Sequence, residues 1–276
     1  MNSTVRTIYG IDLALSNLKG TIYNPLPNTT LNEKFNLKIK RPREVIDNPI
    51  IKGFCIGNGN KNIIDSTNDD VNLFYGRYNP TDASLHSHIP FIVRELRFDL
   101  GDNEKKQYRL RKEFVIGDMK YVAYYMKVIN TLDQKSQLLK INVKPDGSYG
   151  VSNFNTSDAS ILNPSETSTE DIATSTNNEY VVISDQITLV LTKDELEEIN
   201  KGMIIMGLDK VNPKINELAI CTGFDAYDDL SEMMESYSTQ IFVFIDLPYE
   251  VDLEINDENG FYREVEIGGM EPIALR

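Results

Sequence analysis

Two runs rich in β-forming residues, joined by a glycine-first connection of two residues, constrain the fold more than any other feature of this chain. The runs are YRLRKEFVI (108–116) and MKYVAYYMKVIN (119–130), and Gly117-Asp118 joins them. Glycine in the first position suits a type II′ turn, whose twist matches that of the flanking strands. We therefore expect an antiparallel hairpin here, and a third run, LLKINVK (138–144), can extend its sheet.

Further runs predict strands along the rest of the chain. IIKGFCIG (50–57) is stopped by a loop of glycine and asparagine, and three more strands follow as YVVISDQITLVLT (180–192), INELAICTG and TQIFVFIDL. YEVDLEI and FYREVEI alternate apolar and charged residues, which predicts a second hairpin across residues 256–260.

Helical signals are fewer. In DASLHSHIPFIVRELRFDL, Asp82 stands at an N-cap position and apolar residues follow at roughly helical spacing up to and beyond Pro90, which predicts one kinked helix or a turn followed by a helix. Thr192 and Glu195 form a capping box that opens a short helix ended by Gly202. DDLSEMMESYS predicts another brief helix. Strands outnumber helices, so the expected fold class is mainly β or α+β, with antiparallel sheets, a few short helices and an extended N-terminal arm.

Four regions follow from these patterns. Residues 1–49 read as the extended arm because four prolines interrupt them; residues 50–145 as a basic β-rich region with one helix; residues 146–179 as a polar loop or linker; and residues 180–276 as an acidic α+β region. The arm nevertheless contains apolar side chains that we expect a neighbouring copy or another protein to cover, namely Leu13, Leu15, Leu18, Ile22 and Tyr23.

Charge is divided unevenly along the chain. Residues 1–145 contain 22 Lys and Arg against 15 Asp and Glu, whereas residues 146–276 contain 6 against 27. The basic residues alternate with acids over predicted strands, which argues against nucleic acid as a partner. The division is either a solvated surface or a self-complementary one, in which the acidic half of one copy faces the basic half of the next.

The two cysteines and the N-terminal sequence bear on the compartment. Cys55 and Cys221 lie in apolar segments, which predicts buried reduced thiols and favours synthesis in a cytoplasm over a disulfide. The absence of a long apolar run predicts no membrane span, and the first 25 residues do not predict a signal peptide.

His86 and His88 are the only histidines, so any histidine-dependent chemistry needs one of them. On an extended segment both rings share a face and could bind a metal together with Asp82 or Glu95, whereas on a helix they point apart. Two ligands without a clear third favour ordinary capping or surface histidines. No serine-nucleophile motif accompanies them, so a hydrolase with His86 or His88 as general base is only a third hypothesis for the function.

Three other patterns are better explained by structure than by chemistry. The loop Gly57-Asn-Gly59-Asn60 lacks the remaining residues of a phosphate-binding motif and reads as a simple turn. The acidic clusters 225–229 (DAYDD) and 257–260 (DENG) do not match a calcium loop. Tyr121, Tyr124 and Tyr125 share one strand, which fits packing or an interface better than sugar stacking. We therefore predict no catalytic, cofactor-binding or metal-binding residues and no cofactor.

Several segments between residues 50 and 246 resemble virion structural proteins of large bacteriophages with contractile tails. They are KGFCIGNGN, NPTDASLHSHIPFIVREL with DLGDNEKKQYRLRK, KYVAYYMKVI, NELAICTGFDA and STQIFVFIDL. The resemblance implies a component of the neck, tail or baseplate that is made in the host cytoplasm and built into the virion in many copies. It carries over no catalytic residue.

The first hypothesis for the function is therefore a structural protein without enzymatic activity, which forms a homo-oligomer and contacts other virion proteins but no membrane. The alternative is a β-rich binding module that recognises a host surface glycan. Oligomeric state in dilute buffer, measured together with glycan-array binding, distinguishes the two.

Overall fold

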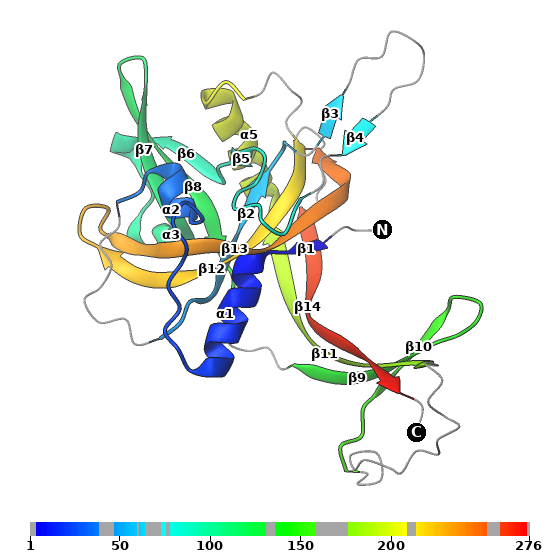
Figure 1. The fold of residues 1–276 in the computed structure, drawn as a ribbon. Helices are drawn as coiled ribbons and strands as arrows, with labels where there is room; N and C mark the ends of the chain where they lie inside the picture. The colour runs from blue at the N-terminus through cyan, green and yellow to red at the C-terminus, as the bar shows by residue number, and fades with distance from the viewer. Residues whose placement is uncertain are drawn as a thin grey trace. The chain divides into compact units, whose positions relative to one another are not determined.

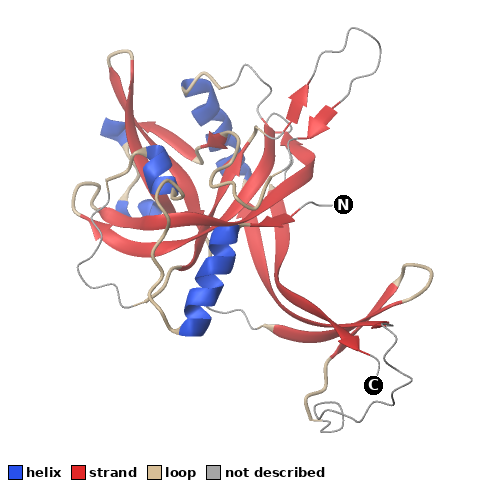
Figure 2. Ribbon diagram, in the orientation of Figure 1, coloured by secondary structure: helices blue, strands red, loops and turns tan. Residues whose placement is uncertain are grey.

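The computed structural model describes residues 4–38, 47–59, 61–63, 73–75, 78–130, 136–157, 176–208, 214–252 and 260–274. In chain order the elements are β1 (Thr4–Arg6), α1 (Ile8–Lys19), α2 (Leu31–Phe35), β2 (Ile50–Gly57), β3 (Lys61–Ile63), β4 (Leu73–Tyr75), β5 (His88–Ile89), β6 (Ile92–Glu95), a 3-10 turn (Leu96–Phe98), α3 (Asp102–Lys105), β7 (Tyr108–Ile116), β8 (Met119–Val128), β9 (Gln137–Val143), β10 (Tyr149–Asn153), β11 (Thr176–Leu191), α5 (Lys193–Ile205), β12 (Lys214–Asp228), β13 (Met233–Asp252) and β14 (Phe261–Ala274) (Figure 1). Strands predominate over short helices (Figure 2), and the pairings are antiparallel. The mainly β or α+β class is confirmed.

The chain divides into two compact units, one of residues 1–130 with 190–262 and one of residues 131–189 with 263–276. The sheet of the first unit has the strand order β1-β13-β12-β2-β8-β6, with β5 paired to β2 and β7 paired to β8. Because β2 lies between β12 and β8, strands from the basic and the acidic half of the sequence share one sheet. The region boundaries expected at 50–145 and 180–276 therefore do not coincide with the units.

The hairpin expected around Gly117-Asp118 is confirmed. β7 and β8 pair from Tyr108 with Lys127 to Ile116 with Met119, and Gly117 has a φ of 58°, which glycine adopts at little cost. The third run forms a strand, β9, but it pairs with β10 and β11 in the second unit instead of extending this sheet. Periodicity identified the strand correctly but carries no information about its partner.

The described part of residues 1–49 is not an extended arm. Thr7 is the N-cap of α1, and its hydroxyl accepts a hydrogen bond from the Gly10 N–H; Gly20, with a φ of 64°, is the C-cap. α2 has a capping box of Thr30 and Glu33. Pro25 and Pro27 fall between the two helices, so they end no regular element.

This N-terminal segment lies along β13. β1 pairs with β13 from Thr4 opposite Ile245 to Arg6 opposite Val243. Further along, the Tyr23 hydroxyl bonds to Gln240 at 2.7 Å, and the Asn32 side chain donates to the Ser236 carbonyl at 2.8 Å. Leu13 is 6% exposed and Tyr23 2%, so this chain itself covers two of the side chains expected to need a neighbour.

The helix expected from Asp82 to residue 100 is wrong. The segment contains β5, β6 and the 3-10 turn instead, and β6 pairs with β8 from Ile92 opposite Tyr124 to Glu95 opposite Tyr121. Pro90 removes a helical N–H donor, and the β-branched Ile89, Ile92 and Val93 favour a strand between buried surfaces.

Two other helix predictions also change. The capping box of Thr192 and Glu195 is confirmed, but α5 continues through Gly202 to Ile205. A Cβ on Gly202 would lie 2.9 Å from Val93 Cγ2, so this glycine allows close packing of α5 on β6. The expected brief helix at 228–238 is a turn followed by the start of β13, because β12 supplies a pairing partner along its whole length.

The second unit is a four-stranded sheet in the order β10-β9-β11-β14. β10 lies within the expected polar loop 146–179 and pairs with β9 from Tyr149 opposite Val143 to Asn153 opposite Leu139, so this part of the loop prediction is wrong. Residues 158–175 lie outside the described residues. β14 is a neighbour of β11. The hairpin expected across residues 256–260 falls largely on residues 253–259, which lie outside the described residues, so it stays a prediction.

The core of the first unit gathers apolar side chains from the sheet and from α2. Its fully buried members come mainly from β2, β7, β8, β12 and β13: Cys55, Leu110, Ala123, Met126, Ala219, Cys221, Ile241 and Phe244. Leu31 and Phe35 of α2 belong to the same cluster.

Candidate functional site

Glu217 on β12 is a fully buried carboxylate surrounded by five hydrogen-bonding partners. It accepts hydrogen bonds from the backbone N–H groups of Gly59 at 3.0 Å, Ser87 at 2.9 Å and His86 at 3.3 Å. The Tyr78 hydroxyl donates to it through a short hydrogen bond, and His86 Nδ1 lies 3.1 Å away. These donors offset the large cost of removing a charge from water.

Gly57 and Gly59 of the loop 57–60 lie in positions around Glu217 that leave no room for a side chain. A Cβ on Gly57 would collide with Glu217 Oε1 and the Ser87 carbonyl, and one on Gly59 would lie 2.6 Å from His86 Cβ. The loop is thus a turn, and the anion it binds is the chain's own Glu217. Asn60 lies outside the described residues.

The cluster contains a carboxylate and an imidazole in the arrangement that acid–base sites use. His86 Nδ1 lies within hydrogen-bond distance of Glu217 Oε2, and the imidazole ring is partly exposed. Burial and the charge of Glu217 raise the pKa of Tyr78, which keeps the phenol protonated as a donor. Because three further partners of Glu217 are backbone N–H groups, the chief effect of the cluster is to fasten residues 57–59 and 86–87 to β12.

The four residues considered as metal ligands are not brought together. The His88 Nε2 accepts from the Leu85 N–H at 3.1 Å, and its ring packs edge-on against Phe35; burial, then the charge of Lys34, lowers its pKa to about 3. Asp82 accepts from the Asn79 N–H at 2.7 Å, and Glu95 pairs with Arg97 at 2.6 Å. Within the described ranges no three His, Cys, Asp or Glu side chains form a metal-binding group.

The acidic cluster 225–229 is occupied by internal contacts. Asp225 lies 3.3 Å from both Lys52 and Arg109, and Asp228 accepts from the Ser231 N–H at 3.0 Å. Most of the cluster 257–260 lies outside the described residues, so its prediction stays a prediction.

The tyrosines of β8 pack as expected. Tyr121 stacks on Phe114 and Tyr125 on Phe35, while the Tyr124 hydroxyl donates to Asp99 at 2.6 Å.

The cysteines are buried free thiols, with 3.7 Å between the Cys55 and Cys221 Sγ atoms. Burial raises the pKa of Cys55, which keeps it an unreactive thiol.

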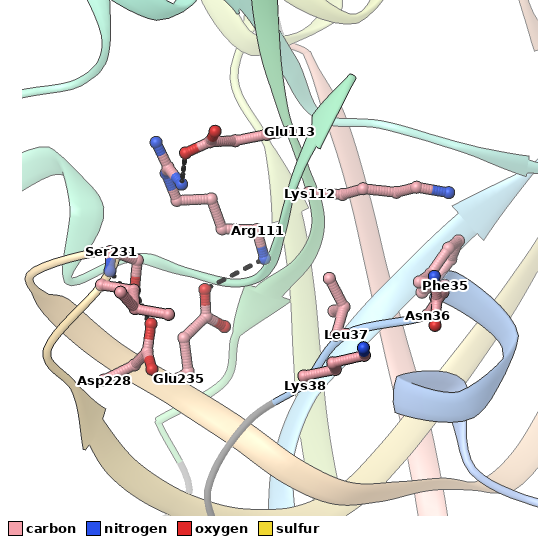
Figure 3. A pocket seen from close by; sticks show the side chains of 11 residues that line it. Phe35, Asn36, Leu37, Lys38, Arg111, Lys112, Glu113, Asp228, Ser231 and Glu235 are labelled. Atoms are coloured by element: carbon pink, nitrogen blue, oxygen red, sulfur yellow. Dashed lines mark hydrogen bonds and ion pairs between the residues drawn. The ribbon is translucent and has the colours of Figure 1, made fainter.

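A pocket of about 400 Å³ lies between the end of α2, β7 and the β12–β13 turn (Figure 3). Arg111 lines the pocket, but its guanidinium is paired with Asp99 at 2.9 Å and with Glu113 at 2.8 Å. Lys38 and Lys112 also line the pocket, and the Lys112 Nζ lies 5.9 Å from the centre of the Phe35 ring.

Glu235 forms the inner wall of this pocket and is 3% exposed. It accepts from the successive backbone N–H groups of Leu110 at 2.8 Å and Arg111 at 3.1 Å. Leu110 has a φ of 56°, a left-handed conformation that costs a residue with a side chain about 1–2 kcal/mol. Burial outweighs these hydrogen bonds and the nearby arginines and raises the pKa of Glu235 to about 7.

The most extensive exposed apolar feature of the N-terminal segment is a stripe on α1, which we call the α1 stripe: Ile8, Ile11, Leu15 and Leu18, continued by Ile22 beyond the helix. An α-helix turns by about 100° per residue, so the four helical members fall within about 80° of one another. Tyr9 and Leu13 cover the opposite side against the sheet. Leu18 is 83% exposed.

The sequence predictions missed four of these features, and three of the four had a local signal in the sequence. The apolar residues that begin at Ile8 and follow at intervals of three, four and three predict one face of a helix. Tyr9 and Leu13 form a second apolar face, which obscures the helical periodicity of the first. Glu217 and Glu235 are single acids in otherwise strand-forming runs, which is the pattern of a buried carboxylate with fixed partners. Nothing in the sequence indicated the left-handed conformation of Leu110.

Comparison with known proteins places the chain in a family without indicating an activity. No helix in the described ranges is both long enough and apolar enough to cross a membrane. Neither the curated proteins nor the solved structures include a match. The family model that matches spans residues 1–276, and the chain accordingly belongs to DUF7208, a family of unknown function.

Proposed function

We propose that this protein is a structural component of a tailed-phage particle, made in the host cytoplasm and assembled in multiple copies in the neck, tail or baseplate, where it acts without catalysis. The single observation that carries the assembly part is the α1 stripe. A helix already docked on its own sheet gains nothing in a monomer from a second apolar face, whereas burial between copies stabilises an assembly.

Two further observations support the proposal. The sequence resembles virion proteins in segments that include parts of β7, β8, β12 and β13. The β7–β8 hairpin ends in exposed Val115, Ile116 and Met119, a second apolar surface of the kind that contacts other proteins.

The experiment has two arms and a control. Sedimentation velocity of the purified chain, over a wide concentration range, is expected to show reversible association. Quantitative mass spectrometry of washed particles, from a phage that encodes this chain, is expected to give several copies per particle. A glycan array serves as the control arm, because strong glycan binding by a strict monomer absent from the particles contradicts the proposal and favours a glycan-binding module.

A further inference from the structure

The α1 stripe has the spacing of a helix-pairing seam. Its helical members follow one another at intervals of three, four and three residues, which is the interval pattern of core positions where two helices pack side by side. α1 spans 12 residues, a length of about 18 Å. A second helix of similar length is therefore the natural cover for it.

Charge beside the stripe selects the direction of the second helix. Asp12 and Lys19 are both exposed and lie seven residues apart, so they flank the stripe on the same side. In an antiparallel pair related by a two-fold axis, the same flank of each helix faces its counterpart. We place the two-fold axis at Leu15, the middle member of the five-residue stripe from Ile8 to Ile22. Measured along the helix axis, Asp12 of one helix then lies within about 2 Å of Lys19 of the other.

A second copy of this chain meets both requirements. It supplies an identical stripe and, by symmetry, two Asp12–Lys19 pairs. In a parallel pair, the flank with Asp12 and Lys19 instead faces the opposite flank of the second helix. That opposite flank contains no charged residue of α1. Neither Asp12 nor Lys19 takes part in an ion pair with another residue of the described ranges.

We propose that two copies of this protein pair through α1 in antiparallel orientation, with the α1 stripe of each covering the other and Asp12 facing Lys19 twice across a two-fold axis. This contact rests on the proposed function and names one interface of the assembly. The contact is small, so the isolated pair is weak and gains strength from the other contacts of a many-copy particle.

Charge reversal tests the direction of pairing. Asp12→Lys and Lys19→Asp each turn two attractions into two repulsions, and each variant alone is expected to associate about tenfold more weakly than wild type. The mixture of the two single variants regains wild-type affinity as a one-to-one heterodimer, because one partner then has two lysines and the other two aspartates. Sedimentation velocity with one fluorescently labelled partner measures this directly.

Leu18→Asp tests the apolar seam and is expected to abolish pairing. Leu230→Asp is the matched control, because Leu230 is 89% exposed on the β12–β13 turn, away from α1, and the variant should pair like wild type. Circular dichroism and thermal unfolding of every variant check that the helix and the fold are intact.

The outcomes separate this inference from the function on which it rests. If wild type associates and the variants associate equally well, the α1 contact is refuted while assembly in multiple copies stands. If the mixture does not regain affinity although each single variant is weakened, antiparallel pairing is refuted. If wild type stays monomeric at all concentrations, both proposals are contradicted.

Discussion

Replacing Glu235 by Gln should remove a pH dependence of stability that runs opposite to that of most carboxylates. Burial raises the pKa of Glu235 from its ordinary 4.5 to about 7 in the folded chain. Between these two values the unfolded chain releases the proton while the folded chain keeps it, so the free energy of unfolding falls as the pH rises. Below about pH 4.5 the two states bind the proton equally, and above about pH 7 the loss is complete.

The size of the effect follows from the two pKa values. A difference of about 2.5 between them corresponds to about 3 kcal/mol between pH 4 and pH 8. Glutamine is neutral throughout, but its amide accepts from only one of the Leu110 and Arg111 N–H groups, so E235Q starts about 1 kcal/mol less stable in acid. Wild type should therefore lose its advantage as the pH rises, and E235Q should be the more stable protein at pH 8.

Urea denaturation of both proteins at several pH values from 4 to 8 measures the difference between their free energies of unfolding. The titration of all other groups cancels in this difference. A difference independent of pH shows that Glu235 has an ordinary pKa. An advantage of wild type that grows with pH refutes the reasoning, because the two N–H groups and the neighbouring Arg109 and Arg111 would then outweigh burial.

Three further substitutions or deletions test other parts of the structure. Gly57→Ala should destabilise the fold by about 1–3 kcal/mol, since the added Cβ collides with the Glu217 carboxylate, and thermal unfolding measures it; an unchanged melting temperature contradicts the packing described around Glu217. Leu110→Gly relieves about 1–2 kcal/mol of backbone strain but empties a fully buried leucine site worth about 2–5 kcal/mol, so a net loss is expected in chemical denaturation, whereas a gain shows that strain dominates. Deletion of residues 1–20 should abolish cooperative unfolding, because β1 pairs with β13 and Leu13 is buried; a truncated chain that melts cooperatively by circular dichroism contradicts the account of this segment.

The sequence predicted local strand structure well because alternation and turn chemistry are local. The hairpin at Gly117, the strand at 50–57 and the capping box at Thr192 all follow from residues within a few positions of one another. Helices were predicted less well, since α1 is apolar on two faces and the segment 82–100 has apolar spacing that fits either period. In both places contacts with distant strands decide the outcome.

The sites were less predictable than the elements. His86 was identified as a residue of interest, but its partner Glu217 is 131 positions away, and no local pattern connects the two. The same holds for Glu235 and the N–H groups of β7. Buried carboxylates take their donors from wherever the fold brings N–H groups, so the sequence indicates that such a residue needs partners but not which ones.

Because the N-terminal segment docks on β13, folding of the first unit cannot be completed until most of the chain has been synthesised. Thr4 pairs with Ile245, so β1 has no pairing partner until β13 has been synthesised. At about 5–20 residues per second, a ribosome needs on the order of 10–50 s to make the chain between them. During that interval α1 has neither its sheet nor a second copy to cover it, and both of its apolar faces are open to chaperones and to proteases. Chains stalled before residue 233 should therefore be cleaved within residues 4–35, and those released after residue 252 should resist, which makes β13 the step that closes the first unit.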